Sequence, residues 1–485
     1  MSKLRTLASD TVVYGTSTIV QRFLTFMLTP IYTNFLTKTE LGDVVYIWSV
    51  IAFLNVLYSF GFESAFLRFY KRDDENRFSV YTHAFLPIVI ISGLVTMFTL
   101  VAPNSIANLL QLSGSDNALL IRLAALIPFA DAIMLIPFAR LRMERKAKQF
   151  AFIKFLLVVI NVALNIILVV WLHKGALAVM IAGVTSSAFG ALLFVPSILK
   201  HLKFEWNADL FSDLTAFGLP TLPSGFSAMM LQVADRPILR MYADAATVGL
   251  YNANYRLGIP MMLFVSVFEY AWKPFYLSHA ADADAKQLFS RVLTYFTVVC
   301  AGLFLVLSLF IGYVVQAPFI GGRFINEAYW SGLHIIPIVA AAYFFNGLAT
   351  NFASGLHITK RTRYIPLATG SAAITNIALN LILIPSLSYT GAAWATFAAY
   401  AVSAIVMYLY SQREFTVDYD WSKVGLVVAG TVSLYAVSTL IPVTQDGTML
   451  LMRIAILSGF VALLYALGFF TANQMAFVKR FLKRG

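Results

Sequence analysis

Five basic residues lie inside long apolar stretches of the sequence: Arg22, Arg122, Lys154, Arg256 and Arg453. A charged side chain at the centre of a membrane helix costs about 2.5–3.5 kcal/mol on insertion scales, so it faces protein or water rather than lipid. Lys154 and Arg453 lie near expected helix ends and can extend to the interface, and Arg122 is similarly shallow. Arg22 and Arg256 lie deeper, so we predict that they line a cavity. The alternative for both is a structural ion pair with an acid on another helix.

Few acidic residues share these stretches. Asp131 lies in the middle of one stretch, and Glu63 lies toward the end of another. We expect each to be a charge partner of a basic residue, and a part in ion coupling is the alternative. The surplus of buried cations over acids favours an anionic cargo, such as a diphosphate. The candidate substrate-binding residues are Arg22, Arg256, Arg122 and Arg68.

The sequence offers no catalytic or metal-binding pattern. It has no GxxxxGK[ST] phosphate loop, no GxSxG nucleophile turn and no HExxH zinc motif. Its one cysteine, Cys300, lies in an apolar run, which excludes a disulfide framework. We therefore expect no enzyme activity, no cofactor and no metal, and coupling to protons or sodium stays open.

The elements that position these residues follow from the composition. Of the 485 residues, 60% are hydrophobic and only 12% are charged, whereas a soluble domain carries about 25% charged residues. The formal net charge of +12 comes from basic residues in short segments between apolar runs. The positive-inside rule explains such segments, so we expect no nucleic-acid partner.

The apolar runs predict an all-α integral membrane protein. About 20 apolar residues cross the hydrocarbon core as a helix, and fourteen runs of about this length can be placed. They cover residues 11–36, 44–67, 80–102, 118–139, 150–172, 175–199, 215–235, 249–272, 288–315, 331–355, 364–385, 389–410, 422–442 and 449–471.

The Lys and Arg residues between these spans predict the orientation. Alternate segments, beginning with the N-terminus, hold 25 of them, and the opposite segments hold five, among them Arg236 and Arg240. By the positive-inside rule, this bias places both termini in the cytoplasm. The N-terminal segment lacks the cleavage pattern of a signal peptide, so we interpret it as a retained first helix.

An internal repeat divides the chain. Asn161 and Asn165 in INVALNIILVV correspond to Asn376 and Asn380 in ITNIALNLILIP, and a weaker similarity links TELGDVVY at 39–46 with ATVGLYNANY at 246–255. A repeat of six helices places both copies in the same orientation, related by a pseudo-twofold axis along the membrane normal. The predicted domains are residues 1–210, residues 211–411, and a C-terminal pair of helices with a cytoplasmic tail at 412–485.

Residues 217–258 read FGLPTLPSGFSAMMLQVADRPILRMYADAATVGLYNANYRLG. This segment resembles the seventh-helix region of Wzx-type polysaccharide flippases in the multidrug/oligosaccharidyl-lipid/polysaccharide (MOP) superfamily, through G-x-P-x-x-P, then Asp-Arg, then Gly-x-Tyr. TKTELGDVVY after the first span looks like its counterpart in the first half. Helix number, orientation and loop rhythm extend the resemblance over essentially the whole chain.

The resemblance implies a function. It implies two six-helix lobes around a central cavity, and export of an undecaprenyl-diphosphate-linked oligosaccharide, such as an O-antigen, capsule or exopolysaccharide repeat unit, across the bacterial inner membrane. In the related lipid II flippases, cavity arginines on helices one, two and eight face the diphosphate. Arg22 and Arg256 lie on the corresponding first and eighth helices, whereas the second helix has only Arg68 at its cytoplasmic end. A groove for the polyprenyl tail between the last two helices, and polymerase and chain-length proteins as partners, are implied as well.

Two other classes stay open. A drug antiporter of the same superfamily would favour an acid-rich cavity, whereas the deep charges here are mainly basic. A membrane-embedded polysaccharide polymerase or ligase would carry polar catalytic loops on the outer face. The longest outer loop, at about residues 103–117, holds a single charged residue, Asp116.

Overall fold

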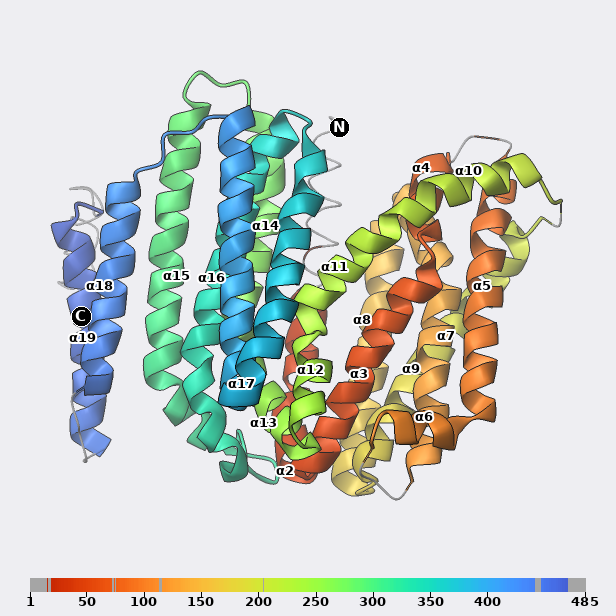
Figure 1. Cartoon of the computed structure of the whole chain (residues 1–485), viewed down its shortest axis with the longest axis horizontal. Helices are drawn as coiled ribbons and strands as arrows, with labels where there is room; N and C mark the ends of the chain where they lie inside the picture. Colours follow the sequence, from red (N-terminus) through yellow and green to blue (C-terminus); the bar gives the residue numbers. More distant parts are fainter. Residues whose placement is uncertain are drawn as a thin grey trace.

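Apolar helices make up most of the chain in the computed structural model, which describes all residues except 1–14, 16–18, 72–73, 75, 113–115, 204, 441–445 and 470–485 (Figure 1). Within the described residues, ten helices are long and apolar enough to cross a membrane. The all-α membrane fold is therefore confirmed, and the count of fourteen spans stays a prediction. The helices are α2 (Leu28–Phe35), α3 (Lys38–Ser59), α4 (Phe62–Phe69), α5 (Arg77–Val101), α6 (Pro103–Leu109), α7 (Asn117–Met143), α8 (Ala147–Asn165), α9 (Gly175–His201), α10 (Ala208–Gly218), α11 (Leu222–Val233), α12 (Asp235–Tyr242), α13 (Ala245–Arg256), α14 (Ile259–His279), α15 (Ala285–Gln316), α16 (Ile336–Ile358), α17 (Ile365–Glu414), α18 (Trp421–Leu440) and α19 (Asp446–Ala466).

Four expected spans have a less regular form than the sequence predicts. The span at 215–235 consists of α10 and α11, joined by a 3-10 turn at Leu219–Thr221 next to Pro220 and Pro223, since proline cannot donate to the helix ladder. The span at 249–272 is interrupted at residues 257–258, between α13 and α14. Helix α17 contains two expected spans and turns back on itself at Ser388, where the backbone is left-handed (φ 50°). Residues 11–14 and 16–18 of the first span lie outside the described part.

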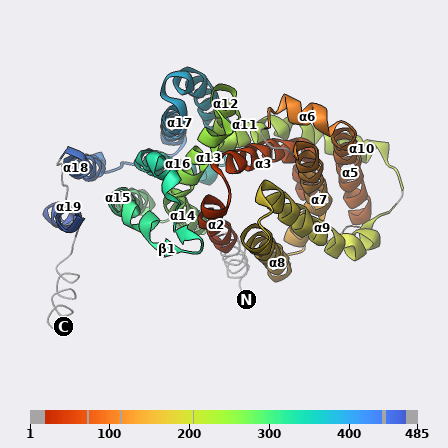
Figure 2. The same cartoon turned by 90° about the horizontal axis from the view of Figure 1, so that it is seen from below.

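Two bundles of helices stand side by side (Figures 1 and 2). The first contains α3, α5, α7, α8 and α9. The second contains α14 to α17, together with the short helices α12 and α13, which pack against α17. Helices α10 and α11 run from the far edge of the first bundle toward the second, and α18 and α19 lie outside the second bundle, beyond α15. A small hairpin of β1 (Pro318–Phe319) and β2 (Gly322–Arg323) follows α15. The domain boundaries expected from the repeat stay a prediction.

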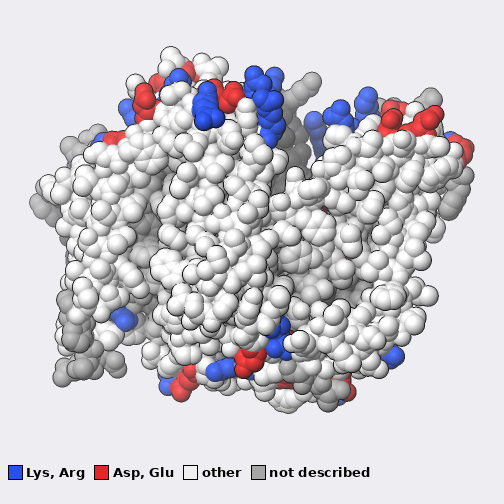
Figure 3. All heavy atoms as spheres, in the orientation of Figure 1, with Lys and Arg blue, Asp and Glu red and all other residues white. Residues whose placement is uncertain are grey.

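Charged side chains gather at the two ends of the bundles. On the face shown in Figure 3, Lys, Arg, Asp and Glu crowd the rim near α4 and α10 and are sparser at the opposite rim, and the band between them is mostly uncharged. A notch separates the two bundles at the rim near α4 and α10. The uncharged band is the surface that a multi-pass membrane protein presents to lipid.

At the end opposite this notch, the bundles meet through helices α3 and α13. A Cβ atom on Gly42 would overlap the backbone carbonyl of Ala245, and one on Gly249 would overlap the carbonyl of Lys38. The contact is reciprocal, because Gly42 and Gly249, and likewise Lys38 and Ala245, occupy matching places in the two similar segments. Reciprocity of this kind defines a twofold arrangement.

The starts of these two helices are capped in the same way. The Thr37 side chain accepts a hydrogen bond from the Glu40 amide (3.2 Å), and the Asp244 side chain accepts one from the Thr247 amide (2.8 Å). Each cap satisfies an amide that has no partner within the helix. The weaker of the two sequence similarities thus corresponds to two equivalent helix starts.

The stronger sequence similarity also has a structural counterpart. The Asn165 side chain donates to the Asn161 carbonyl (2.9 Å) and to its Oδ1 atom (3.1 Å). The Asn380 side chain makes the same two bonds to Asn376, at 2.8 and 2.9 Å. Identical hydrogen bonds at matching positions support the internal repeat.

Side chains from the two bundles add polar contacts near the helix crossing. Arg240 on α12 lies 3.7 Å from the Asp43 carboxylate on α3 and donates to the Gln111 carbonyl at 2.5 Å. The Asn34 side chain donates to the Arg323 carbonyl at 2.7 Å. These contacts join the two bundles at the end opposite the notch.

We expect Gly42→Ala to lower the midpoint of thermal unfolding of the purified protein. The added methyl group overlaps the Ala245 carbonyl, and overpacking costs about 1–3 kcal/mol. Gly312→Ala is the matched control, because a Cβ atom at this position on α15 meets nothing within 4 Å and alanine favours a helix over glycine by about 0.8–1 kcal/mol. Equal midpoints for the two variants would contradict a tight crossing.

Candidate substrate cavity

A cavity of about 830 Å³ lies between the two bundles. Its volume falls within the range of about 300–1,000 Å³ that ligand pockets occupy. One wall comes from α3, α4, α7, α8 and α9, and the other comes from α11 to α14 and α16, with residues 21–32 contributing as well. Among the described residues, four basic and two acidic side chains line it: Arg142, Lys154, Arg236, Arg256, Glu63 and Asp131.

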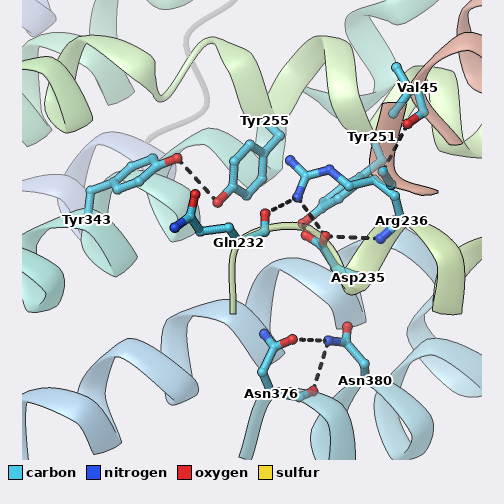
Figure 4. Close-up of polar contacts among 10 residues, drawn as sticks. Val45, Gln232, Asp235, Arg236, Tyr251, Tyr255, Tyr343, Asn376 and Asn380 are labelled. Carbon is cyan, nitrogen blue, oxygen red and sulfur yellow. Dashed lines mark hydrogen bonds and ion pairs between the residues drawn. The ribbon is translucent and has the colours of Figure 1, made fainter. Parts of the chain in front are cut away.

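The wall of the second bundle contains a buried ion pair (Figure 4). The Arg236 guanidinium donates to the Asp235 carboxylate at 2.6 Å and to the Gln232 carbonyl at 2.6 Å. The Tyr251 hydroxyl donates to the other carboxylate oxygen of Asp235 at 2.5 Å. The Arg236 guanidinium also lies 4.5 Å from the centre of the Tyr255 ring, a favourable position for a cation. These partners hold Arg236 in place at the cavity surface.

Arg256, the last residue of α13, has a different environment. Its guanidinium contacts the Thr29 hydroxyl at 3.4 Å, and none of the acids that the structure describes lies within 4 Å of it. It faces the cavity next to Tyr32 and Tyr255. Arginine presents several donors in a fixed fork that matches phosphate oxygens. The charge of Arg256 is therefore free to meet an anionic ligand.

The wall of the first bundle carries charges of both signs. Glu63 on α4 forms an ion pair with Arg142 at the end of α7. Asp131 accepts a hydrogen bond from the Ser187 hydroxyl at 2.8 Å. The Lys154 ammonium lies 4.3 Å from the centre of the Phe138 ring. Acids and bases are thus balanced in number on this wall.

The structure brings only some of the predicted site residues into the cavity. Arg256, Asp131 and Glu63 line it, and Glu63 has the basic charge partner that we expected. Arg22 does not line it: this residue is exposed and donates to the Ser266 hydroxyl on α14 at 2.7 Å.

Two further candidates also lie elsewhere. Arg122 is exposed, and Arg68 is exposed with its guanidinium 4.8 Å from the centre of the Phe217 ring. Neither belongs to the cavity lining. Arg122 was predicted to line the cavity from its position along the span. Whether a side chain lines the cavity also depends on the direction in which it points from the helix axis.

Three lining residues were missed by the sequence analysis. Arg236 was counted in an outer loop, whereas α12 holds it buried inside the protein. Lys154 was expected to extend to the interface, and Arg142 lies between the expected spans 118–139 and 150–172, but both line the cavity. The adjacent Asp235 and Arg236 gave one usable signal, since an acid and a base side by side in an apolar segment can neutralise each other.

Within the described residues, no group of three or more His, Cys, Asp or Glu side chains could hold a metal ion. The described cavity lining consists of hydrogen-bonding and charged side chains set among aromatic and aliphatic ones. Such a surface binds and orients a ligand.

Comparison with known proteins identifies the family of this chain and proteins with the same fold. A family model described as "Polysaccharide biosynthesis protein" matches residues 31–326, more than half of the chain. A curated relative from Haloferax volcanii, the probable low-salt glycan biosynthesis flippase Agl15, is 22% identical over 272 residues. That match covers 55% of this chain and 56% of the relative, so the chain spans about half the length of the curated relative it matches.

Solved structures show the same fold. The lipid II flippase MurJ in an inward closed conformation gives a TM-score of 0.71 at 16% identity, over 94% of this chain and 99% of that chain. A multidrug resistance MATE family transporter of the MOP superfamily, in an inward-facing conformation, gives a TM-score of 0.59 at 15% identity, over 81% of this chain and 94% of that chain.

Two helical bundles with a cavity between them thus give this protein the fold of MOP superfamily transporters. By its sequence, the chain belongs to the polysaccharide biosynthesis protein family. The family expected from the Asp-Arg and Gly-x-Tyr segment is confirmed. The relatives are named as flippases and transporters, not as enzymes.

We expect Asp235→Asn to destabilise the protein strongly. The Arg236 charge would lose its buried partner, and breaking such a pair costs about 3–5 kcal/mol. The double variant Asp235→Asn/Arg236→Gln removes both charges, so its loss should be smaller than the sum of the two single losses. Denaturation midpoints of the four proteins in detergent would measure this coupling, and additive single losses would rule it out.

Proposed function

We propose that this protein moves an undecaprenyl-diphosphate-linked oligosaccharide from the cytoplasmic to the outer leaflet of the bacterial inner membrane by alternating access. The O-antigen, capsule and exopolysaccharide repeat units are cargoes of this class. The observation that carries the proposal is Arg256, a cavity-facing arginine without an acid among the described residues within 4 Å. The family and the named flippases support it.

The physical problem that such a protein solves is the headgroup. A diphosphate cannot cross about 30 Å of hydrocarbon unaided. Arg256 can replace part of its hydration with charge-assisted hydrogen bonds. Arg236 lies on the same wall, where Asp235 compensates its charge. The polyprenyl tail can stay in lipid throughout, and the resemblance implies a groove at α18 and α19 for it.

The direction of transport follows from the proposed orientation. The segments at 68–77, 140–148 and 200–203 are basic, and the rim near α4 and α10 is the one with the notch. If this rim is cytoplasmic, as the positive-inside rule predicts, the cavity faces the side where the lipid-linked oligosaccharide is made. Outward movement of each negative charge gains about 2.3 kcal/mol per 100 mV of cytoplasm-negative potential.

A drug antiporter is the second candidate, because MATE transporters share the fold. A cavity for cationic drugs needs acids that are free to bind them. Here Glu63 is paired with Arg142, whereas Arg256 has no acid among the described residues within 4 Å. The cavity therefore favours an anion.

We expect Arg256→Ala to abolish flipping, whereas Arg256→Lys should retain part of it, because lysine keeps the charge but loses the fork of donors. Arg363→Ala is the matched control, since this arginine is exposed next to Tyr364, outside the cavity lining. The measurement is transfer of an undecaprenyl-diphosphate-linked oligosaccharide across proteoliposomes that contain equal amounts of each variant. Normal transfer by Arg256→Ala would remove this residue from the site and the proposal with it.

A further inference from the structure

The cavity wall of the first bundle has a chemistry that a diphosphate does not need. Besides its charged residues, it presents side-chain amides from Asn55 on α3 and Asn161 on α8, and the Ser187 hydroxyl on α9. The Asn161 amide donates to the Ser186 hydroxyl at 3.3 Å. A phosphate oxygen only accepts hydrogen bonds, whereas this wall offers acceptors as well as donors.

Asp131 is the centre of this wall. Its carboxylate accepts a hydrogen bond from Ser187 at 2.8 Å, and Asn55 lies within reach of it. Lys154 interacts with it electrostatically, yet the ion pairs of the described residues include none between Asp131 and Lys154, so their charged atoms lie more than 4 Å apart. An acceptor and a donor held apart in a cavity wall can both contact one intervening group.

Sugar hydroxyls fit this arrangement. Each hydroxyl donates one hydrogen bond and accepts others, so a carbohydrate site must offer both kinds of group. The same wall also presents the exposed ring of Trp48, whose flat apolar surface can cover the C–H face of a sugar ring. Its charges balance, because Glu63 pairs with Arg142 and Asp131 stands beside Lys154. A balanced wall neither attracts nor repels a neutral glycan.

We infer that this wall is a carbohydrate subsite, centred on Asp131, Ser187 and Asn55, that binds the sugars next to the diphosphate held by the opposite wall. The inference rests on the proposed function. It assigns selectivity to the first bundle and charge recognition to the second. A site that hydrogen-bonds hydroxyls discriminates well, since an absent hydroxyl leaves polar groups of the wall unpaired.

The test separates the two walls by using two probes. Purified full-length protein in nanodiscs is titrated with undecaprenyl diphosphate and with an undecaprenyl-diphosphate-linked oligosaccharide extracted from the source organism. We expect the wild type to bind the glycosylated lipid more tightly. Asp131→Asn and Ser187→Ala should each reduce the affinity for the glycosylated lipid by about tenfold, the value of one hydrogen bond to a charged group. Their affinity for the bare lipid should stay within about twofold of wild type, which also shows that they are folded.

Ser92→Ala is the matched control for Ser187→Ala. Ser92 is fully buried on α5, bonds only a carbonyl of its own helix among the hydrogen bonds of the described residues, and does not line the cavity. It should bind both lipids as the wild type does. Wild-type preference for the glycosylated lipid in Asp131→Asn and Ser187→Ala would overturn the subsite.

The proposed function and the subsite fail in different ways. Equal wild-type affinity for the two lipids would overturn the subsite and leave diphosphate recognition standing. No binding of either lipid by the wild type would overturn both.

Discussion

The backbone contact between Gly42 and Gly249 is the constraint on which the rest of the arrangement depends. Helices α3 and α13 approach each other there without side chains between them. Gly42 faces the Ala245 carbonyl, and Gly249 faces the equivalent carbonyl of Lys38. Small residues allow membrane helices to pack closely. Because the bundles touch at this end, the space between them can widen only toward the other end, where the notch lies. The position of the cavity is thus a consequence of two residues without side chains.

The buried charges follow a second constraint, which is that an ion in a low-dielectric environment must be compensated. In the wall of the second bundle, Asp235 compensates the charge of Arg236 and also accepts a hydrogen bond from Tyr251. The wall of the first bundle meets the same constraint through Glu63 and Arg142. Arg256 has no such acid among the described residues, and its guanidinium contacts the Thr29 hydroxyl. A protein keeps a charge of this kind at such cost when the charge has a function.

The sequence predicts depth in the membrane better than it predicts direction. Hydropathy was enough for most spans, and the offset of the paired asparagines revealed a repeat whose hydrogen bonds match. Arg256 was predicted to line the cavity, and it does. Arg22 has a similar depth, yet it turns to Ser266. Neighbouring helices determine the direction in which a side chain points, and a single sequence does not contain that packing.

Broken helices account for the other misses. A hydropathy window treats 215–235 as one span followed by a loop, so it assigns Arg236 to the outer surface. In the structure, the chain continues as α12, which is short and carries a buried ion pair. The prolines at 220 and 223 indicate a break, but they do not indicate where the chain goes after it. Only the contacts of Arg236 with Asp235 and Tyr255 explain why a charged segment returns into the protein.

Helix α13 connects the closed end of the bundles to the ligand site. It carries Gly249 at the crossing and Arg256 at its last residue. Residues seven apart on a helix lie within about 20° of the same face and about 10 Å apart along the axis. Any rearrangement that separates Gly249 from Lys38 must therefore move Arg256 relative to the wall that holds Asp131. Helix α13, with 12 residues, thus couples opening of the bundles at the crossing to the position of Arg256 in the cavity. This coupling needs no side-chain contact between α3 and α13 at the crossing itself.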